Sequence, residues 1–193
     1  MQIDRNLNLV MPVDLDDGKT VYVHSVPVQR EVFEKYYRVM SRTFANLMRD
    51  GSILSGPRTA LLELRAVAGE LGTLEGEGGV EMGLIAEMRR LSNLVLPAPE
   101  GGWTTLPLEH VIGRQMLSAD DVSEVENRIA FFTLQSRLLL RRELVASVTQ
   151  MARLWDAQIV SSTCTEYARS LPTLTVAVSS GETVASSAST LPG

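Results

Sequence analysis

The chain has 193 residues, of which 45 % are hydrophobic and 21 % charged, values typical of a globular protein with a real core. Its formal net charge of −5 argues against a dedicated nucleic-acid-binding protein, because such proteins usually carry a basic excess. No apolar run approaches the roughly 18 residues of a membrane-spanning helix, and the charged N-terminus does not look like a signal peptide. A single cysteine cannot form an internal disulfide, so we expect a soluble protein of a reducing, intracellular compartment.

The first 27 residues predict a β-hairpin. Leu7, Leu9, Met11 and Val13 alternate with other residues, and a second alternating stretch follows the turn-forming "DLDDGK". Gly18 can take the positive φ that a tight turn needs. Two strands alone are marginal in water, so we expect this hairpin to pack on helices or on a partner's sheet.

Helical patterns dominate the next segments of the chain. The apolar residues of 29–49 fall on one face, which predicts an amphipathic helix that begins near Ser25 and stops at Gly51. A second helix is expected over 55–72. A third is expected from residue 80 to just before Pro97, because the stretch "VEMGLIAEMRRLSNLVL" continues the same kind of pattern.

Residues 97–107 are rich in glycine and proline and are interpreted as a turn-rich connection, followed by a short helix within 106–117. The stretch 118–160 is the longest helical region, and Ser118 with Asp121 forms a capping-box-like start. Its two apolar series fall out of phase near Arg141, which predicts a kink or break there.

Thr163 and Glu166 have the same capping-box spacing, so a short terminal helix is expected, ended by Pro172. Residues 173–193 are rich in serine and threonine and carry one charge, at Glu182. Such a segment buries too little apolar surface to offset its ordering entropy, so we expect a flexible tail. The residues Leu174, Val176 and Val178 alternate, which would let them join a sheet.

The cysteine and the two histidines do not form a catalytic or metal-binding pattern. Cys164 would need a base to act as a nucleophile, and neither His24 nor His110 is brought near it by the sequence pattern. One cysteine and two histidines are too few for a zinc site of the usual spacing. We therefore expect no enzyme activity, no catalytic residues, no cofactor and no metal.

The aromatic and methionine side chains of the long helical region have two interpretations. Most are expected to be core residues, but some could form an exposed groove for a partner segment, a role that suits flexible methionines. The candidate partner-binding residues are Phe131, Phe132, Met151 and Trp155.

Three stretches resemble one family of phage proteins: "DDGKTVYVHSVPVQREVFEKYYRVMSRTF", "EVENRIAFFTL" and "LWDAQIVSSTCTEYARSLPT". They are similar to the tail assembly chaperones of long-tailed phages that infect Gram-negative bacteria. The resemblance implies a protein of the host cell cytoplasm that coats the tape measure protein and helps to gather tail tube proteins around it, without catalysis. It also implies that a longer, frameshifted form can exist, and it leaves self-association open.

Together these observations predict a mainly α protein, with an N-terminal β-hairpin packed on a multi-helix domain and a flexible C-terminal tail. The expected units are residues 1–27, 28–172 and 173–193. The tape measure and tail tube proteins are the expected partners. Binding to nucleic acid or to a membrane is not expected. The alternative function is a structural virion protein of the phage tail or head–tail connector, in which the hairpin and tail would join neighbouring subunits' sheets.

Overall fold

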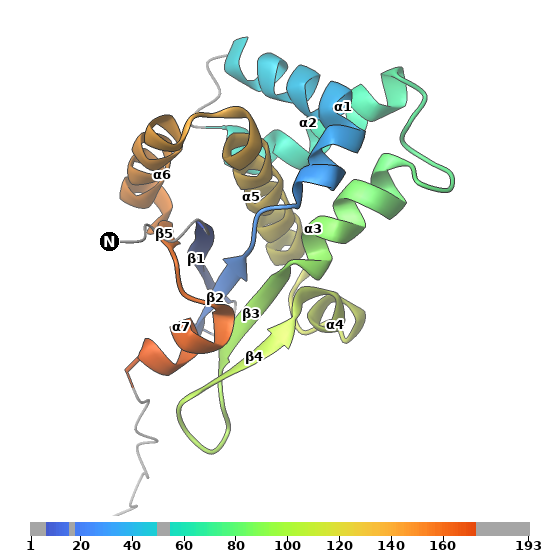
Figure 1. The fold of residues 1–193 in the computed structure, drawn as a ribbon. Coiled ribbons are helices and arrows are strands. Elements are labelled where there is room, and N and C mark those ends of the chain that lie inside the picture. The colour runs from blue at the N-terminus through green and yellow to red at the C-terminus, as the bar shows by residue number, and fades with distance from the viewer. Residues whose placement is uncertain (1–6, 16–17, 50–54, 173–193) are drawn as a thin grey trace, which may run out of the picture.

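The computed structural model describes residues 7–15, 18–49 and 55–172 (Figure 1). The strands are β1 (Asn8–Asp14), β2 (Thr20–Ser25), β3 (Ser92–Pro97), β4 (Trp103–Pro107) and β5 (Gln158–Val160). The helices are α1 (Arg30–Arg49), α2 (Gly56–Glu70), the π-helix η1 (Val80–Ile85), α3 (Ala86–Arg90), α4 (Leu108–Gly113), α5 (Ala119–Leu138), α6 (Arg141–Trp155) and α7 (Cys164–Ser170). The expected flexible tail, 173–193, lies outside the described residues.

All five strands form one antiparallel sheet in the order β4-β3-β2-β1-β5. The predicted hairpin, β1 and β2, is confirmed and lies in the middle of this sheet. Gly18 takes a φ of +78° in the turn, and Leu15 N donates to Lys19 O at 2.8 Å next to the turn, between the end of β1 and the start of β2. The hairpin therefore has strand neighbours on both sides, which two isolated strands would lack.

The inner face of the sheet packs against most of the helices and forms the main core. Alternate residues of β1, β2 and β3 point to this face, because successive side chains of a strand point to opposite sides. Helix α5 packs on β1 and on α2, and α1 packs on both α2 and α5 (Figure 1). The sheet's contribution to this core consists of Leu9, Met11, Val13, Val21, Val23 and Leu94.

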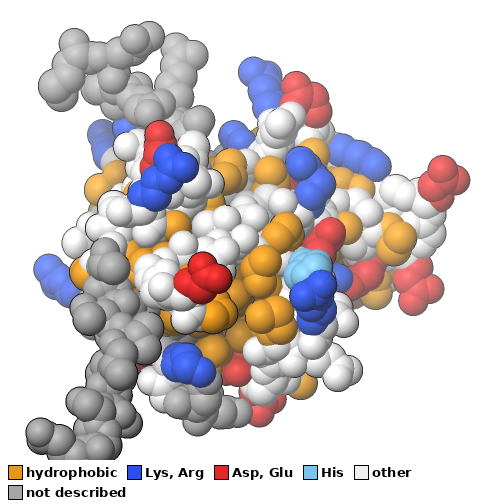
Figure 2. Space-filling view, turned by 90° about the horizontal axis from the view of Figure 1, so that it is seen from below, with side chains coloured by type: hydrophobic (Ala, Val, Ile, Leu, Met, Phe, Trp, Pro, Cys, Tyr) orange, Lys and Arg blue, Asp and Glu red, His pale blue; other side chains and the backbone are white. Residues whose placement is uncertain are grey.

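The outer face of the sheet carries a second, smaller core beneath α7. Val10 and Val95 pack there with Tyr167 and Ala168 of α7. Trp103 Nε1 donates to Pro172 O at 2.9 Å, which ties the end of the α7 segment to β4. The view of the molecule from below shows hydrophobic side chains between charged ones (Figure 2). The protein thus has three layers: helices, sheet and α7.

The expectation of a mainly α fold was wrong, because the fold is mixed α/β. Of the described residues, 59 % are helical and 17 % are in strands. Residues 92–96 were expected to continue a helix but form β3, the partner that completes the hydrogen bonds of β2. The expected turn region 97–107 contains β4, and the end of the expected long helix contains β5. For β3 and β5, pairing with distant strands outweighs local helical preference, and β4 forms a hairpin with β3 across a short turn.

Several local predictions are confirmed. Ser118 accepts a hydrogen bond from Asp121 N at 3.1 Å, and Thr163 accepts one from Glu166 N at 3.3 Å, so both capping boxes form. The long helical region breaks at Leu139 and Leu140, whose backbones are extended, between α5 and α6. The first amphipathic helix also forms, but it begins at Arg30 because Ser25 belongs to β2.

Candidate partner-binding site

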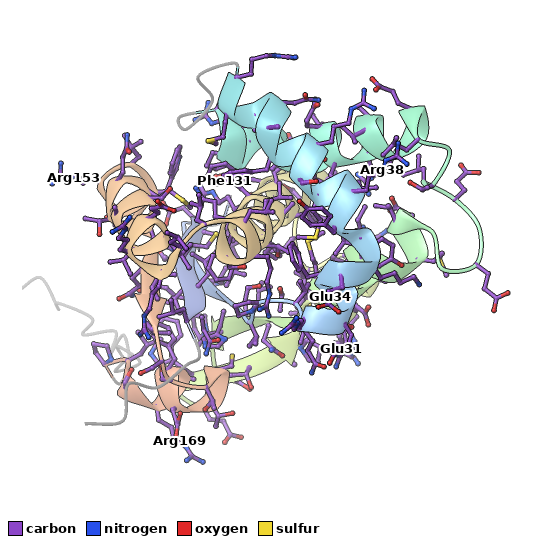
Figure 3. All side chains as sticks on the ribbon, turned by 45° about the horizontal axis from the view of Figure 1, so that its top comes forward. Glu31, Glu34, Arg38, Phe131, Arg153 and Arg169 are labelled. Carbon is purple, nitrogen blue, oxygen red and sulfur yellow. The ribbon has the colours of Figure 1, made fainter. Side chains whose placement is uncertain are left out.

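The four predicted partner-binding residues lie on α5 and α6 in different surroundings. Phe131 and Phe132 of α5 are completely buried, and Figure 3 shows Phe131 in the middle of the helices. Met151 of α6 is also buried, at 1 % exposure. Only Trp155, at the end of α6, is partly exposed. Within the described conformation, three of the four are core side chains, and partner binding by the set stays a prediction.

Helix α6 faces the core with one narrow strip and leaves its two flanks open. Leu144, Val148 and Met151 form the buried strip at helical spacing. Val145, on the flank toward β5, is 46 % exposed, and Leu154, on the opposite flank, is 51 % exposed. Exposed apolar side chains on a helix that is otherwise well packed are candidates for contact with another protein.

A groove of about 230 Å³ runs between α6 and β5. Its walls are mostly apolar, and their residues come from one helix and from the strand that follows it. A groove lined by apolar side chains can take an apolar side chain of a partner. The lining residues are Val145, Val148, Thr149, Ala152, Ala157, Gln158 and Ile159.

The strand that borders this groove is an edge of the sheet. β5 is last in the strand order, so among the described residues only β1 pairs with it. Leu15 N donates to Lys19 O, so this is a hydrogen-bonded pair of the antiparallel ladder between β1 and β2. Because such pairs alternate along the ladder, the backbone groups of the odd-numbered residues of β1 bond to β2, and those of the even-numbered residues face β5. Asn8 and Val10 are therefore the residues that bond to β5, opposite Val160 and Gln158. It follows that Ile159, between those two, turns its backbone groups toward the open edge.

The neighbouring part of the same edge is closed. Pro12 is the next even-numbered residue of β1, and proline has no N–H to offer a further strand. Its carbonyl oxygen accepts a hydrogen bond from Arg128 Nη1 of α5 at 3.2 Å. The Arg128 side chain is held in place by Glu124, and its burial lowers the pKa of the guanidinium. Edge pairing is therefore blocked at Pro12 and available at Ile159.

A polar cleft of about 320 Å³ lies on the other flank of α6, and Trp155 is one of its walls. The carboxylates of Asp14, Glu124 and Asp156 also line it. In the part of the chain that the structure describes, no three His, Cys, Asp or Glu side chains are grouped closely enough to hold a metal ion. The charged walls of this cleft contrast with the mostly apolar walls of the groove beside β5.

The surroundings of Cys164 do not favour a nucleophile. Burial raises the pKa of its thiol to about 11, so the reactive thiolate is scarce at neutral pH. His24 contacts Ser162 O through Nε2 at 2.9 Å, and Asn8 Nδ2 donates to the same oxygen at 3.0 Å. These two side chains fix the turn between β5 and α7. His110 is exposed on α4.

The described helices include none that is both long and apolar enough to cross a bilayer. The sequence matches no protein-family model, and it has no significant match among curated proteins or solved structures.

The sequence pointed to residues on both α5 and α6 and missed the groove. Val145 was not among the selected residues, and Ile159 was expected to belong to the end of a helix. A local signal was present in the sequence. Asp156 is of a residue type that can end a helix, and it takes a positive φ of 51° in the structure; the β-branched pair Ile159 and Val160 follows soon after it. Asparagine and aspartate are the residues other than glycine that most readily adopt this conformation, which often ends helices.

Proposed function

We propose that the protein is a tail assembly chaperone of a long-tailed phage, acting in the host cell cytoplasm without catalysing a reaction. In this proposal it binds a segment of the tape measure protein and helps to recruit tail tube subunits. The observation that carries the proposal is the apolar groove between α6 and β5, bordered by an open strand edge at Ile159. The resemblance of three sequence stretches to this chaperone family is the reason for proposing the tape measure protein as the partner.

The chemistry of a chaperone agrees with this surface. A long client with exposed apolar segments needs an apolar surface that covers those segments before assembly. Val145 and the groove beside it offer such a surface without unfolding the core. The raised pKa of the Cys164 thiol is consistent with a function that involves no covalent step.

Co-expression with the tape measure protein of the same phage tests the proposal. We expect the tape measure protein to be soluble when this protein is present and to aggregate when it is absent. The amount of soluble tape measure protein, measured in the supernatant after centrifugation, is the readout. Equal solubility with and without this protein would refute the chaperone function.

A structural virion protein is the second candidate, and one observation favours it. The sheet ends in two strands, β4 and β5, that have a neighbour on only one side among the described residues. Adjacent subunits in a tail or connector could extend such a sheet. Mass spectrometry of purified particles separates the two functions, because a chaperone is expected to be absent and a structural subunit abundant.

A further inference from the structure

We infer that the groove between α6 and β5 binds an extended, acidic segment, which adds to the open edge of β5 and places one aliphatic side chain in the groove. This inference rests on the proposed function, because it names the chemistry of the client segment. It makes three separate claims about the partner: its backbone conformation, its apolar anchor and its charge.

The backbone claim comes from the position of Ile159. Its N–H and C=O turn toward the open edge, since Gln158 and Val160 are the residues of β5 that bond to β1. An unpaired strand edge is a ready template for a partner strand. Pro12 and Arg128 close the adjoining edge of β1, so a partner strand has one short place to pair.

The claim about an anchor comes from the walls of the groove. Val145 and Ala152 of α6 stand opposite Ile159, and the groove has a volume of about 230 Å³. Side chains of an added strand alternate in direction, so every second one would point toward α6. The space suits one leucine-sized or valine-sized side chain with apolar walls around it.

The claim about charge comes from the exposed side of α6 that adjoins the groove. Arg142, Val145, Thr149 and Arg153 are three or four residues apart and therefore lie along the same side of the helix. Both arginines are exposed, and neither forms an ion pair with another described residue. Figure 3 shows Arg153 projecting from α6 away from the rest of the molecule.

The acidic residues Glu143 of α6 and Asp156, just after it, do not pair with these arginines. The Glu143 carboxylate accepts a hydrogen bond from Leu140 N at 2.9 Å and so caps the start of the helix. Asp156 lines the cleft on the opposite flank. Arg142 precedes and Arg153 follows the groove residues Val145 and Thr149 along this side of α6. Two exposed arginines so spaced favour a client segment with acidic residues on both sides of its apolar anchor.

Two synthetic peptides with capped ends, EEVLVEE and KKVLVKK, test the charge claim on the full chain. Both have the same apolar centre, and titration calorimetry at low salt gives the two dissociation constants. We expect EEVLVEE to bind about tenfold more tightly or better, because each acidic end meets one arginine. The Arg142→Gln/Arg153→Gln double variant should lose that preference, whereas the control variant Arg38→Gln/Arg169→Gln should keep it. The control arginines lie on α1 and α7 (Figure 3).

Backbone pairing is tested with two EEVLVEE analogues, each N-methylated at one of the two sets of alternate amides. Only one set can face β5, so one analogue should bind normally and the other should not. Peptide binding should also slow hydrogen exchange at the Ile159 amide. For the anchor, Val145→Gln should weaken EEVLVEE binding about tenfold, and Leu154→Gln on the other flank should leave it unchanged.

Several outcomes would overturn the inference: no binding of EEVLVEE, equal or tighter binding of KKVLVKK, or loss of binding by both or neither N-methylated analogue. The proposed function has a separate test in the solubility of the tape measure protein. Discrimination between the peptides without rescue of the tape measure protein would leave this inference standing and remove the proposed partner. If the tape measure protein is rescued but the two peptides bind equally, the proposed partner stands and this inference falls.

Discussion

Helices α5 and α6 are neighbours in sequence, yet their surroundings differ in a way that separates structural residues from exposed ones. Every residue of α5 from 125 to 135 is buried, whereas α6 buries only one strip along its length. The ring of Phe131 lies so close to Gly56 that a β-carbon there would be 2.4 Å from Cε2. Val145 of α6 has no such enclosure. An aromatic residue in a long helix is therefore poor evidence of a binding surface until its other neighbours are known.

Polar side chains show the same contrast. On α5 two of them are buried with partners: Asn127 Oδ1 accepts a hydrogen bond from Leu61 N at 2.9 Å, and Glu126 pairs with Arg89 at 2.5 Å. On α6 the arginines at 142 and 153 face solvent. Burial on all sides makes α5 the centre of the fold, and one-sided burial leaves α6 free to meet a partner.

The largest effect should come from truncating α5. Phe131→Ala should lower the free energy of unfolding by about 3–5 kcal/mol, because it removes a completely buried ring and leaves a cavity. Urea denaturation followed by circular dichroism measures this. Tyr37→Ala, which removes an aromatic ring that is 54 % exposed, is the control and should cost far less. A near-neutral Phe131→Ala variant would mean that α5 is not the central helix.

A smaller effect is expected on the buried strip of α6. Leu144→Ala should cost about 2 kcal/mol, the lower end for such a change, because α6 packs on one side only. Native-state hydrogen exchange should show faster opening of α6 than of α5 in this variant. Val145→Ala, the exposed neighbour, is the control. Equal loosening of α5 and α6 would show that the two helices unfold as one unit.

The stability of the protein should depend on pH through His24 of β2, which contacts the segment that joins α6 to α7. Burial lowers the pKa of His24 below its usual value of about 6.5, although its contact with Ser162 O opposes this shift. The unfolded chain then binds the proton more readily than the folded one, so stability should fall as the pH drops below about 6.5. Denaturation at several pH values between 5 and 7.5 measures the slope of the free energy of unfolding against pH. His24→Gln should reduce this slope and His110→Gln should not; an unchanged slope in His24→Gln would refute this origin.

The features that could be predicted from sequence are those encoded by nearby residues. The Gly18 turn, both capping boxes and the break between α5 and α6 depend on residues a few positions apart. β3 and β5 depend on pairing with distant strands, such as Asn8 with Val160, about 150 positions apart, and short apolar segments do not reveal such pairing. β4 pairs with β3 across a short turn, and it was missed because β3 was expected to be helical. The groove was missed for the same reason, since one of its walls is β5.

The most direct test compares two variants with the unchanged protein in co-expression with the tape measure protein. Val145→Gln and Leu154→Gln each remove an exposed apolar side chain from α6, on opposite flanks, and each should change stability by no more than about 0.5 kcal/mol. If the flank facing β5 binds the client, Val145→Gln should leave the tape measure protein largely insoluble, while Leu154→Gln should keep it soluble. Equal rescue by the two variants, or loss of rescue only in Leu154→Gln, would contradict a binding site between α6 and β5.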